Sequence, residues 1–162
     1  MATTRGVRRE GERATSVTVS YVITLGISVV LISGLVMAGG NVLEDQRDGA
    51  SRTGLRVAGQ QLASDVATVD RLVTAGTDVD VSLVSDLPAR IAGEAYIVEI
   101  RAHPTLPEVA VLTLTAAESE VVVEVTVRHR TPIRLPTRVS GGRLRIEYDA
   151  DAAPAEVVVR GA

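Results

Sequence analysis

Few side chains in this sequence are of the types that perform catalysis or hold metal ions. The 162 residues include no cysteine, which excludes disulfides, thiolate nucleophiles and cysteine zinc sites. The two histidines, His103 and His129, have no second histidine or helical carboxylate at the spacing of metal ligands. His129 also lies between two arginines, whose charge makes an imidazole a poor proton acceptor. We therefore predict no catalytic residue, no cofactor and no small-molecule ligand, and we expect the protein not to be an enzyme.

Two pairs of carboxylates flank expected strands, Asp78 with Asp80 and Asp149 with Asp151. Carboxylate oxygens bind Ca²⁺, but a calcium site takes about six to eight oxygen ligands, and no single loop here supplies enough of them. We interpret these pairs as solvated turn residues and predict no metal site.

Arginine is the one charged residue type that clusters. All 17 cationic side chains are arginine, and six of them fall in a stretch without an acid: Arg128, Arg130, Arg134, Arg138, Arg143 and Arg145. Such a stretch could contact DNA, an anionic surface polymer or lipid head groups. No aromatic residue is interleaved for base stacking, so nucleic acid is not the expected partner. We favour ion pairing with carboxylates of this chain or of a neighbouring subunit.

The element that must position everything else is an apolar run near the N-terminus. Residues 14–43 carry no charge, and residues 17–38 consist mainly of Val, Ile, Leu, Met, Gly and Ala. As a helix these 22 residues span about 33 Å, which matches the hydrocarbon core of a bilayer, about 30 Å thick. The run therefore predicts a transmembrane helix over residues 14–40.

The charges on either side of this run set its orientation. Residues 1–13 hold four arginines against two glutamates, whereas the chain after Leu43 holds 13 arginines against 18 acids. Because short cytoplasmic flanks carry the excess of basic residues, we expect residues 1–13 to be a cytoplasmic leader. The expected location is the cell membrane, crossed once, with the C-terminal part extracellular.

Three processing outcomes remain open for this segment. It is an uncleaved anchor, a signal peptide cut after Ala38, or a retained helix whose leader is cut within the region Gly11, Glu12, Arg13 and Ala14. The apolar stretch is longer than the 7–15 residues usual for a signal peptide, which argues against the second outcome.

A second helical pattern follows a glycine interruption at residues 39–41. Apolar residues then recur at spacings of three and four: Leu55, Ala58, Leu62, Val66, Val69 and Val73. This period predicts an amphipathic helix over residues 41–76 with one apolar face.

The remainder, residues 77–162, has the alternation typical of strands. We predict strands at residues 79–83, 96–101, 109–115, 121–128, 143–148 and 157–159. The expected fold class is α+β, in which an antiparallel sheet of four to six strands packs its apolar face on the amphipathic half of the long N-terminal helix.

This order of elements, with the junction Arg13-Ala14-Thr15-Ser16-Val17, resembles the type IV pilins and pseudopilins, particularly those of haloarchaea. All-arginine usage and the excess of acids in the outer part suit the same comparison. The apolar run lacks the glutamate found five residues into many bacterial pilins, so a minor or pseudopilin-like protein fits better than a major subunit.

The resemblance implies that the N-terminal helices associate with one another in a pilus-like or secretion-related assembly. Helices in lipid approach closely through small residues, and the candidate face is Ser16, Ser20, Thr24, Ser28, Gly34 and Ala38. The expected partners are the lipid bilayer and other pilin-like subunits. The alternative is a plain single-pass or secreted protein with an unrelated extracellular β domain for binding or scaffolding.

Overall fold

The computed structural model describes residues 5–76 and 80–162, with side chains from residue 19 onward except at Asn41. The chain divides into two compact units, residues 1–45 and residues 46–162. Every buried hydrophobic side chain that the structure describes belongs to the second unit.

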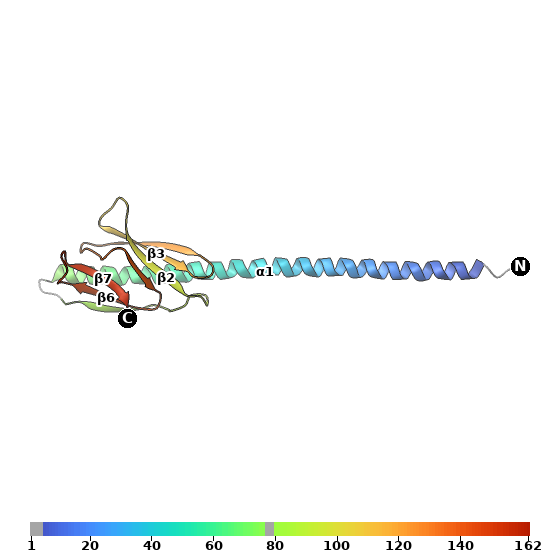
Figure 1. Cartoon of the computed structure of the whole chain (residues 1–162), viewed down its shortest axis with the longest axis horizontal. Coiled ribbons are helices and arrows are strands. Elements are labelled where there is room, and N and C mark those ends of the chain that lie inside the picture. Colours follow the sequence, from blue (N-terminus) through green and yellow to red (C-terminus); the bar gives the residue numbers. More distant parts are fainter. Residues whose placement is uncertain (1–4, 77–79) are drawn as a thin grey trace. The chain divides into compact units, whose positions relative to one another are not determined.

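One helix, α1, extends from Arg5 to Ala75 (Figure 1). Residues 39–41, where the glycines predict a kink or hinge, lie within the continuous helix α1. A glycine in a helix interior costs about 1 kcal/mol relative to alanine, but no proline removes a hydrogen bond here, and helical sequence on both sides carries the helix across. A Cβ atom at Gly39 or Gly40 would meet nothing within 4 Å.

Seven strands follow the helix. They are β1 Ser82–Asp86, β2 Tyr96–Ala102, β3 Val109–Ala116, β4 Val122–Arg128, β5 Thr137–Ser140, β6 Arg143–Asp149 and β7 Glu156–Gly161. Five of the predicted strands are confirmed to within two residues. The first begins three residues later than predicted, and β5 was not expected because it is short and lies between Pro136 and Gly141.

The strands form two sheets, which corrects the prediction of a single one. The order is β1-β6-β7 in one sheet and β4-β3-β2-β5 in the other, and all five pairings are antiparallel. The connector before β5 joins the two sheets, since Arg134 N donates to Val157 O at 2.9 Å and Val157 N donates to Pro132 O at 2.7 Å. Pro132 has no N–H to donate, but its carbonyl accepts one of the two hydrogen bonds of this junction.

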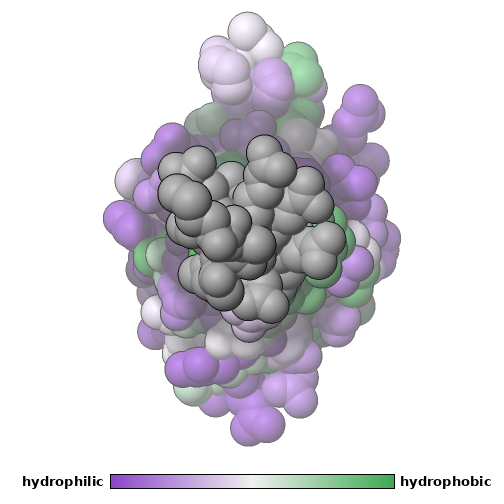
Figure 2. All heavy atoms as spheres, turned by 90° about the vertical axis from the view of Figure 1, so that its right-hand side faces the viewer, coloured by the Kyte–Doolittle hydropathy of each residue, from purple (hydrophilic) through white to green (hydrophobic). Residues whose placement is uncertain are grey.

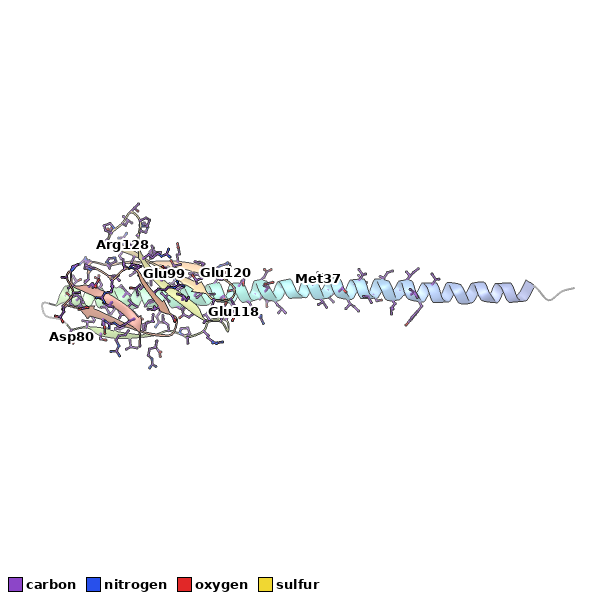
Figure 3. All side chains as sticks on the ribbon, viewed as in Figure 1. Met37, Asp80, Glu99, Glu118, Glu120 and Arg128 are labelled. Atoms are coloured by element: carbon purple, nitrogen blue, oxygen red, sulfur yellow. The ribbon has the colours of Figure 1, made fainter. Side chains whose placement is uncertain are left out.

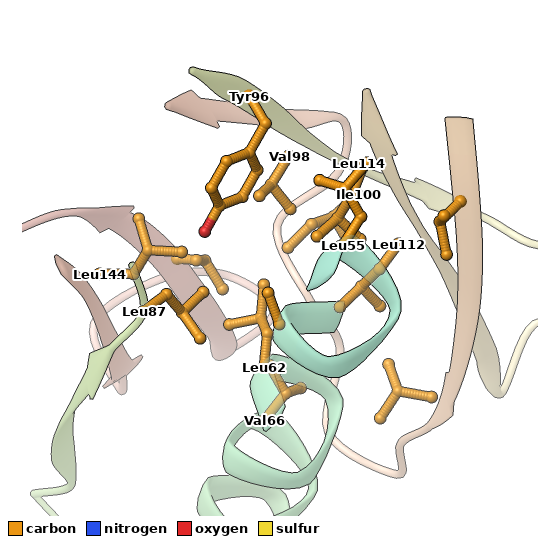
Figure 4. Packing of buried hydrophobic residues seen from close by; sticks show 14 of the residues in the cluster. Leu55, Leu62, Val66, Leu87, Tyr96, Val98, Ile100, Leu112, Leu114 and Leu144 are labelled. Carbon is orange, nitrogen blue, oxygen red and sulfur yellow. The ribbon is translucent and has the colours of Figure 1, made fainter. Parts of the chain in front are cut away.

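The apolar stripe of α1 lies against both sheets. Leu55, Leu62 and Val69 are fully buried, as the helical spacing predicts. Figure 4 shows Leu62 and Val66 of the helix with Leu87 and Leu144 on one side, and Leu112 and Leu114 of β3 on the other. The α+β layout of the expected fold is therefore confirmed, with the helix shared by two sheets.

Gly59 is a site of close approach between this part of the helix and the four-stranded sheet. A Cβ atom there would lie 2.9 Å from Leu114 Cδ1 and 2.9 Å from Val125 Cγ2. The absence of a side chain lets the helix settle onto β3 and β4, which offsets the poor helix propensity of glycine.

Candidate functional site

The large apolar side chains of the N-terminal segment of α1 are exposed within their own unit. Fifteen large apolar side chains between Val19 and Leu43 are 52–75 % exposed, among them Tyr21, Leu35 and Met37. Figure 3 shows the side chain of Met37 projecting from the helix. The most apolar 18-residue window has a mean hydropathy of 2.3, and none of it is buried. This helix is therefore long and apolar enough to cross a membrane.

Two hydroxyl groups within this segment are satisfied by the helix itself. Thr24 Oγ1 donates to Ser20 O, and Ser28 Oγ donates to Thr24 O, both at 2.9 Å. A hydroxyl that bonds to the carbonyl four residues earlier does not need water, so it is compatible with a hydrocarbon environment.

Small residues of the predicted association face gather on one side of α1. At about 100° per residue, Ser20, Thr24, Ser28, Gly34 and Ala38 fall within about 120° of the helix circumference. A Cβ atom at Gly34 would meet nothing within 4 Å. The side chain of Ser16, like those of Gly11, Glu12, Arg13 and Ala14 in the predicted cleavage region, lies outside the described residues.

The six clustered arginines are not brought together by the fold. By strand register, Arg143 and Arg145 lie on the outer face of the three-stranded sheet, whereas Arg128 and Arg138 lie on the outer face of the other sheet. Arg130 falls in the turn after β4.

Two of these arginines form ion pairs with acids of the same chain. Arg134 Nε donates to Glu156 Oε1 at 2.6 Å, and its Nη2 donates to Asp149 Oδ2 at 3.2 Å. Glu156, followed by Asp149, raises the pKa of Arg134. Arg143 Nε lies 3.4 Å from Asp86 Oδ1. The arginines therefore divide between two surfaces that also carry carboxylates, and Arg134 and Arg143 are the members of the six with an ion pair in the described structure. Most of the coloured spheres in Figure 2 belong to hydrophilic residues.

The histidines do not form a joint site. His129 Nδ1 donates to Thr131 O at 2.9 Å, and its Nε2 is buried without a hydrogen-bond partner in the described structure. This ring lines an open hollow of about 570 Å³ with Pro107, Glu108 and Ile133. His103 is half-buried in the turn after β2, where its Nδ1 accepts a hydrogen bond from Thr105 N at 3.3 Å.

The predicted turn carboxylates split in the same way. Asp80, Asp149 and Asp151 line a shallow groove of about 410 Å³, in which Asp149 already pairs with Arg134. Asp78 lies outside the described residues. Among the side chains that the structure describes, from residue 19 onward, no three His, Cys, Asp or Glu residues are grouped so that they could hold a metal ion.

A family comparison covers both units of the chain. The model of a family described as "Family of unknown function (DUF7266)" matches residues 10–160. The chain belongs to the DUF7266 family. No curated protein and no solved structure matches it. The DUF7266 match begins ahead of the apolar segment and ends within β7, so the family is defined by the helix together with the sheets.

Two carboxylates of this DUF7266 chain have structural roles that the sequence did not indicate. Asp70 is 7 % exposed, and its Oδ1 accepts hydrogen bonds from Arg130 N at 3.0 Å and Thr131 N at 2.7 Å. It thereby holds the turn after β4 against the helix. The spacing of the apolar stripe placed Asp70 off the buried face, because that pattern counts only apolar residues.

Glu94 is the second and more heavily bonded carboxylate. It is 8 % exposed and accepts from Ser51 Oγ at 2.7 Å, Ser119 Oγ at 2.7 Å, Ser119 N at 2.9 Å and Glu118 N at 3.0 Å. These bonds, that from Ser51 first, lower the pKa of Glu94 from 4.5 to about 2. Glu94 joins the helix to the hairpin that leads into β4. No local sequence motif predicts this contact, because its residues lie far apart in the sequence.

Proposed function

We propose that this chain is a non-enzymatic, single-pass membrane protein of the cell envelope, built on a pilin-like or pseudopilin-like plan. Residues 14–40 anchor it in the bilayer. Residues 46–162 form an extracellular domain, and residues 1–13 remain in the cytoplasm. The DUF7266 family assignment gives no function of its own, so the proposal depends on physical properties of the chain.

The observation that carries the proposal is the exposed apolar segment. Burying one large apolar side chain contributes about 1.5–3 kcal/mol, and fifteen large apolar side chains between Val19 and Leu43 are exposed by more than half. A soluble monomer does not retain an apolar surface of that size. A lipid bilayer, or a bundle of like helices, is the environment that covers it.

Two further features support the pilin-like form of the proposal. The order of elements, one long N-terminal helix followed by antiparallel strands, is the order of that class. The small residues on one side of the apolar segment provide a surface on which helices in lipid can approach closely. The charge difference between the two flanks supports the assigned orientation.

N-terminal sequencing of the mature protein from isolated membranes tests the proposal. A membrane-bound chain that begins at residues 12–15 supports the pilin-like form. A membrane-bound chain with an intact Met1 supports the anchor but contradicts the processed, pilin-like form. A chain that begins at Gly39 and is released from the membrane overturns the anchor.

A further inference from the structure

Strand β4 has an open edge. It is the terminal strand of the sheet β4-β3-β2-β5, so no strand in the described part of the chain lies along its far side. Natural sheets protect such edges with prolines, bulges, charged side chains or a covering element. Residues 122–128 contain no proline, pair with β3 in an unbroken register, and expose the side chain of Val122 to 51 %.

The hydrogen bonds to β3 show which backbone groups face the open edge. Ala116 N donates to Val121 O at 3.0 Å, and His129 N donates to Glu108 O at 2.9 Å. Because the direction of backbone groups alternates along an antiparallel strand, the odd-numbered residues of β4 bond to β3. The N–H and C=O groups of Val122, Glu124, Thr126 and Arg128 therefore point away from the sheet.

The charged side chains of β4 are arranged so that the strand complements itself. Glu124 and Arg128 are exposed, lie on the same face, and are equidistant from Thr126. When two β4 strands pair antiparallel about Thr126, Glu124 of each copy stands opposite Arg128 of the other. Neither side chain takes part in an ion pair within the described structure. Another edge strand, β1, carries Asp86 as its one charged residue and has no such symmetry.

The geometry points to β4 as a docking strand for the β4 strand of a second copy of this chain, with Thr126 on the two-fold axis. The even-numbered residues that face the edge pair with one another in this register, as an antiparallel ladder requires. The ladder ends at Arg128, because the next outward N–H, that of Arg130, is already bonded to Asp70. The two four-stranded sheets then form one continuous sheet.

The direction of β4 relative to the helix determines which copies can meet. Ser51 of α1 shares the Glu94 carboxylate with Ser119, just before β4, and Asp70 of α1 bonds to Arg130, just after β4. The helix and β4 therefore run in the same direction. When the two β4 strands are antiparallel, helix residues 46–75 of the two copies are antiparallel as well. Residue 46 of one copy then lies at one end of the pair, and residue 46 of the other copy lies at the opposite end.

Since the apolar segment joins each copy at residue 46, the two anchors begin at opposite ends of the pair, as a contact between two facing membranes requires. This step depends on the membrane anchor of the proposed function. A ladder of five residues buries less surface than a stable dimer needs, so a single pair is weak. Many copies on each membrane add their effects through multivalency. The proposed role of β4 is therefore adhesion between membranes that carry the same protein.

Charge reversals test the register in full-length protein reconstituted into phospholipid vesicles, with clustering followed by light scattering. Wild-type vesicles should cluster. Glu124→Arg vesicles and Arg128→Glu vesicles should each lose clustering, because like charges then face one another. A mixture of the two should recover it, since each variant complements the other. Failure of wild-type vesicles to cluster, or unchanged clustering in either single variant, overturns the proposal.

A cysteine variant tests the pairing without any bilayer, which separates its failure from that of the anchor. The chain has no native cysteine. In detergent, Thr126→Cys should form a disulfide-linked dimer, because paired Cα atoms at the two-fold axis lie about 5.5 Å apart, within disulfide range. Thr113→Cys, on the same face of the inner strand β3, should remain monomeric. No cross-link in the Thr126→Cys variant, or equal cross-linking of both variants, contradicts the pairing, whereas failure of the protein to enter vesicles contradicts the anchor alone.

Discussion

Ser51 of α1 donates a 2.7 Å hydrogen bond to the buried carboxylate of Glu94, a residue 43 positions further along the chain. The same carboxylate binds the backbone and hydroxyl of Ser119. One side chain therefore connects the helix, the turn before β2 and the hairpin before β4, and it fixes where β4 begins relative to the helix.

Substitution of this carboxylate by its neutral isostere should destabilise residues 46–162. Glu94→Gln presents an amide N–H₂ to donors that need an acceptor, and hydrogen bonds to a charged group contribute about 1.5–3 kcal/mol. We expect a loss of about 2 kcal/mol in the free energy of unfolding at pH 7, measured by denaturant titration. Glu118→Gln, at an exposed side chain beside it, should change stability little.

Acid should remove the same contribution from the wild-type protein. The folded-state pKa of Glu94 is about 2, below its ordinary value of 4.5. Its stabilisation is therefore complete above pH 4.5 and is lost as the pH falls from 4.5 toward 2. The difference in stability between wild type and Glu94→Gln should shrink over that range. A difference that stays constant from about pH 7 to about pH 2 would show that charge at Glu94 is unimportant.

Two glycines of α1 should respond in opposite directions to substitution. Gly59→Val places methyl groups against Leu114 and Val125, and overpacking of this kind costs about 1–3 kcal/mol. Gly49→Ala meets nothing within 4 Å and should stabilise the helix by up to about 1 kcal/mol. Thermal unfolding of both variants measures the contrast. Equal effects of the two substitutions would contradict the close packing at Gly59.

The amphipathic face of the helix and most strands follow from the sequence, because alternation at a period of about 3.6 or 2 residues directly reports which face is buried. Leu55 and Leu62 show this for the helix, and Val98 and Ile100 for β2. The division into two sheets does not follow from the sequence, since pairing depends on contacts between segments far apart, such as Pro132 with Val157. Glu94 and Asp70 were missed for the same reason. The association face is a matter of helical spacing and could be proposed from sequence, whereas the self-complementarity of β4 required knowing that it lies at an edge.

A charge within the apolar segment should weaken membrane attachment. Val29→Arg places a guanidinium at the centre of the expected span, which costs about 2.5–3.5 kcal/mol of insertion free energy. Flotation with membranes in a density gradient measures the loss. Val57→Arg is the matched control, because Val57 is equally apolar and 59 % exposed but lies on the helix of residues 46–75. Equal loss from both variants would contradict a span confined to the N-terminal segment.

Bulk on the small-residue face should weaken association between apolar helices. Ser20→Leu and Gly34→Leu prevent close approach, since backbones in lipid meet through small side chains. Cross-linking in membranes should fall for both variants and remain unchanged for Val22→Leu, which points to the opposite side of the helix. Full cross-linking of all three variants would exclude this face as the contact.

Membrane fractionation of the full-length protein tests the central claim most directly. We expect the chain to remain in the membrane pellet after an alkaline carbonate wash, with residues 46–162 accessible to protease added outside intact cells. Recovery of the intact chain as a water-soluble monomer without detergent would contradict the anchor and the orientation together.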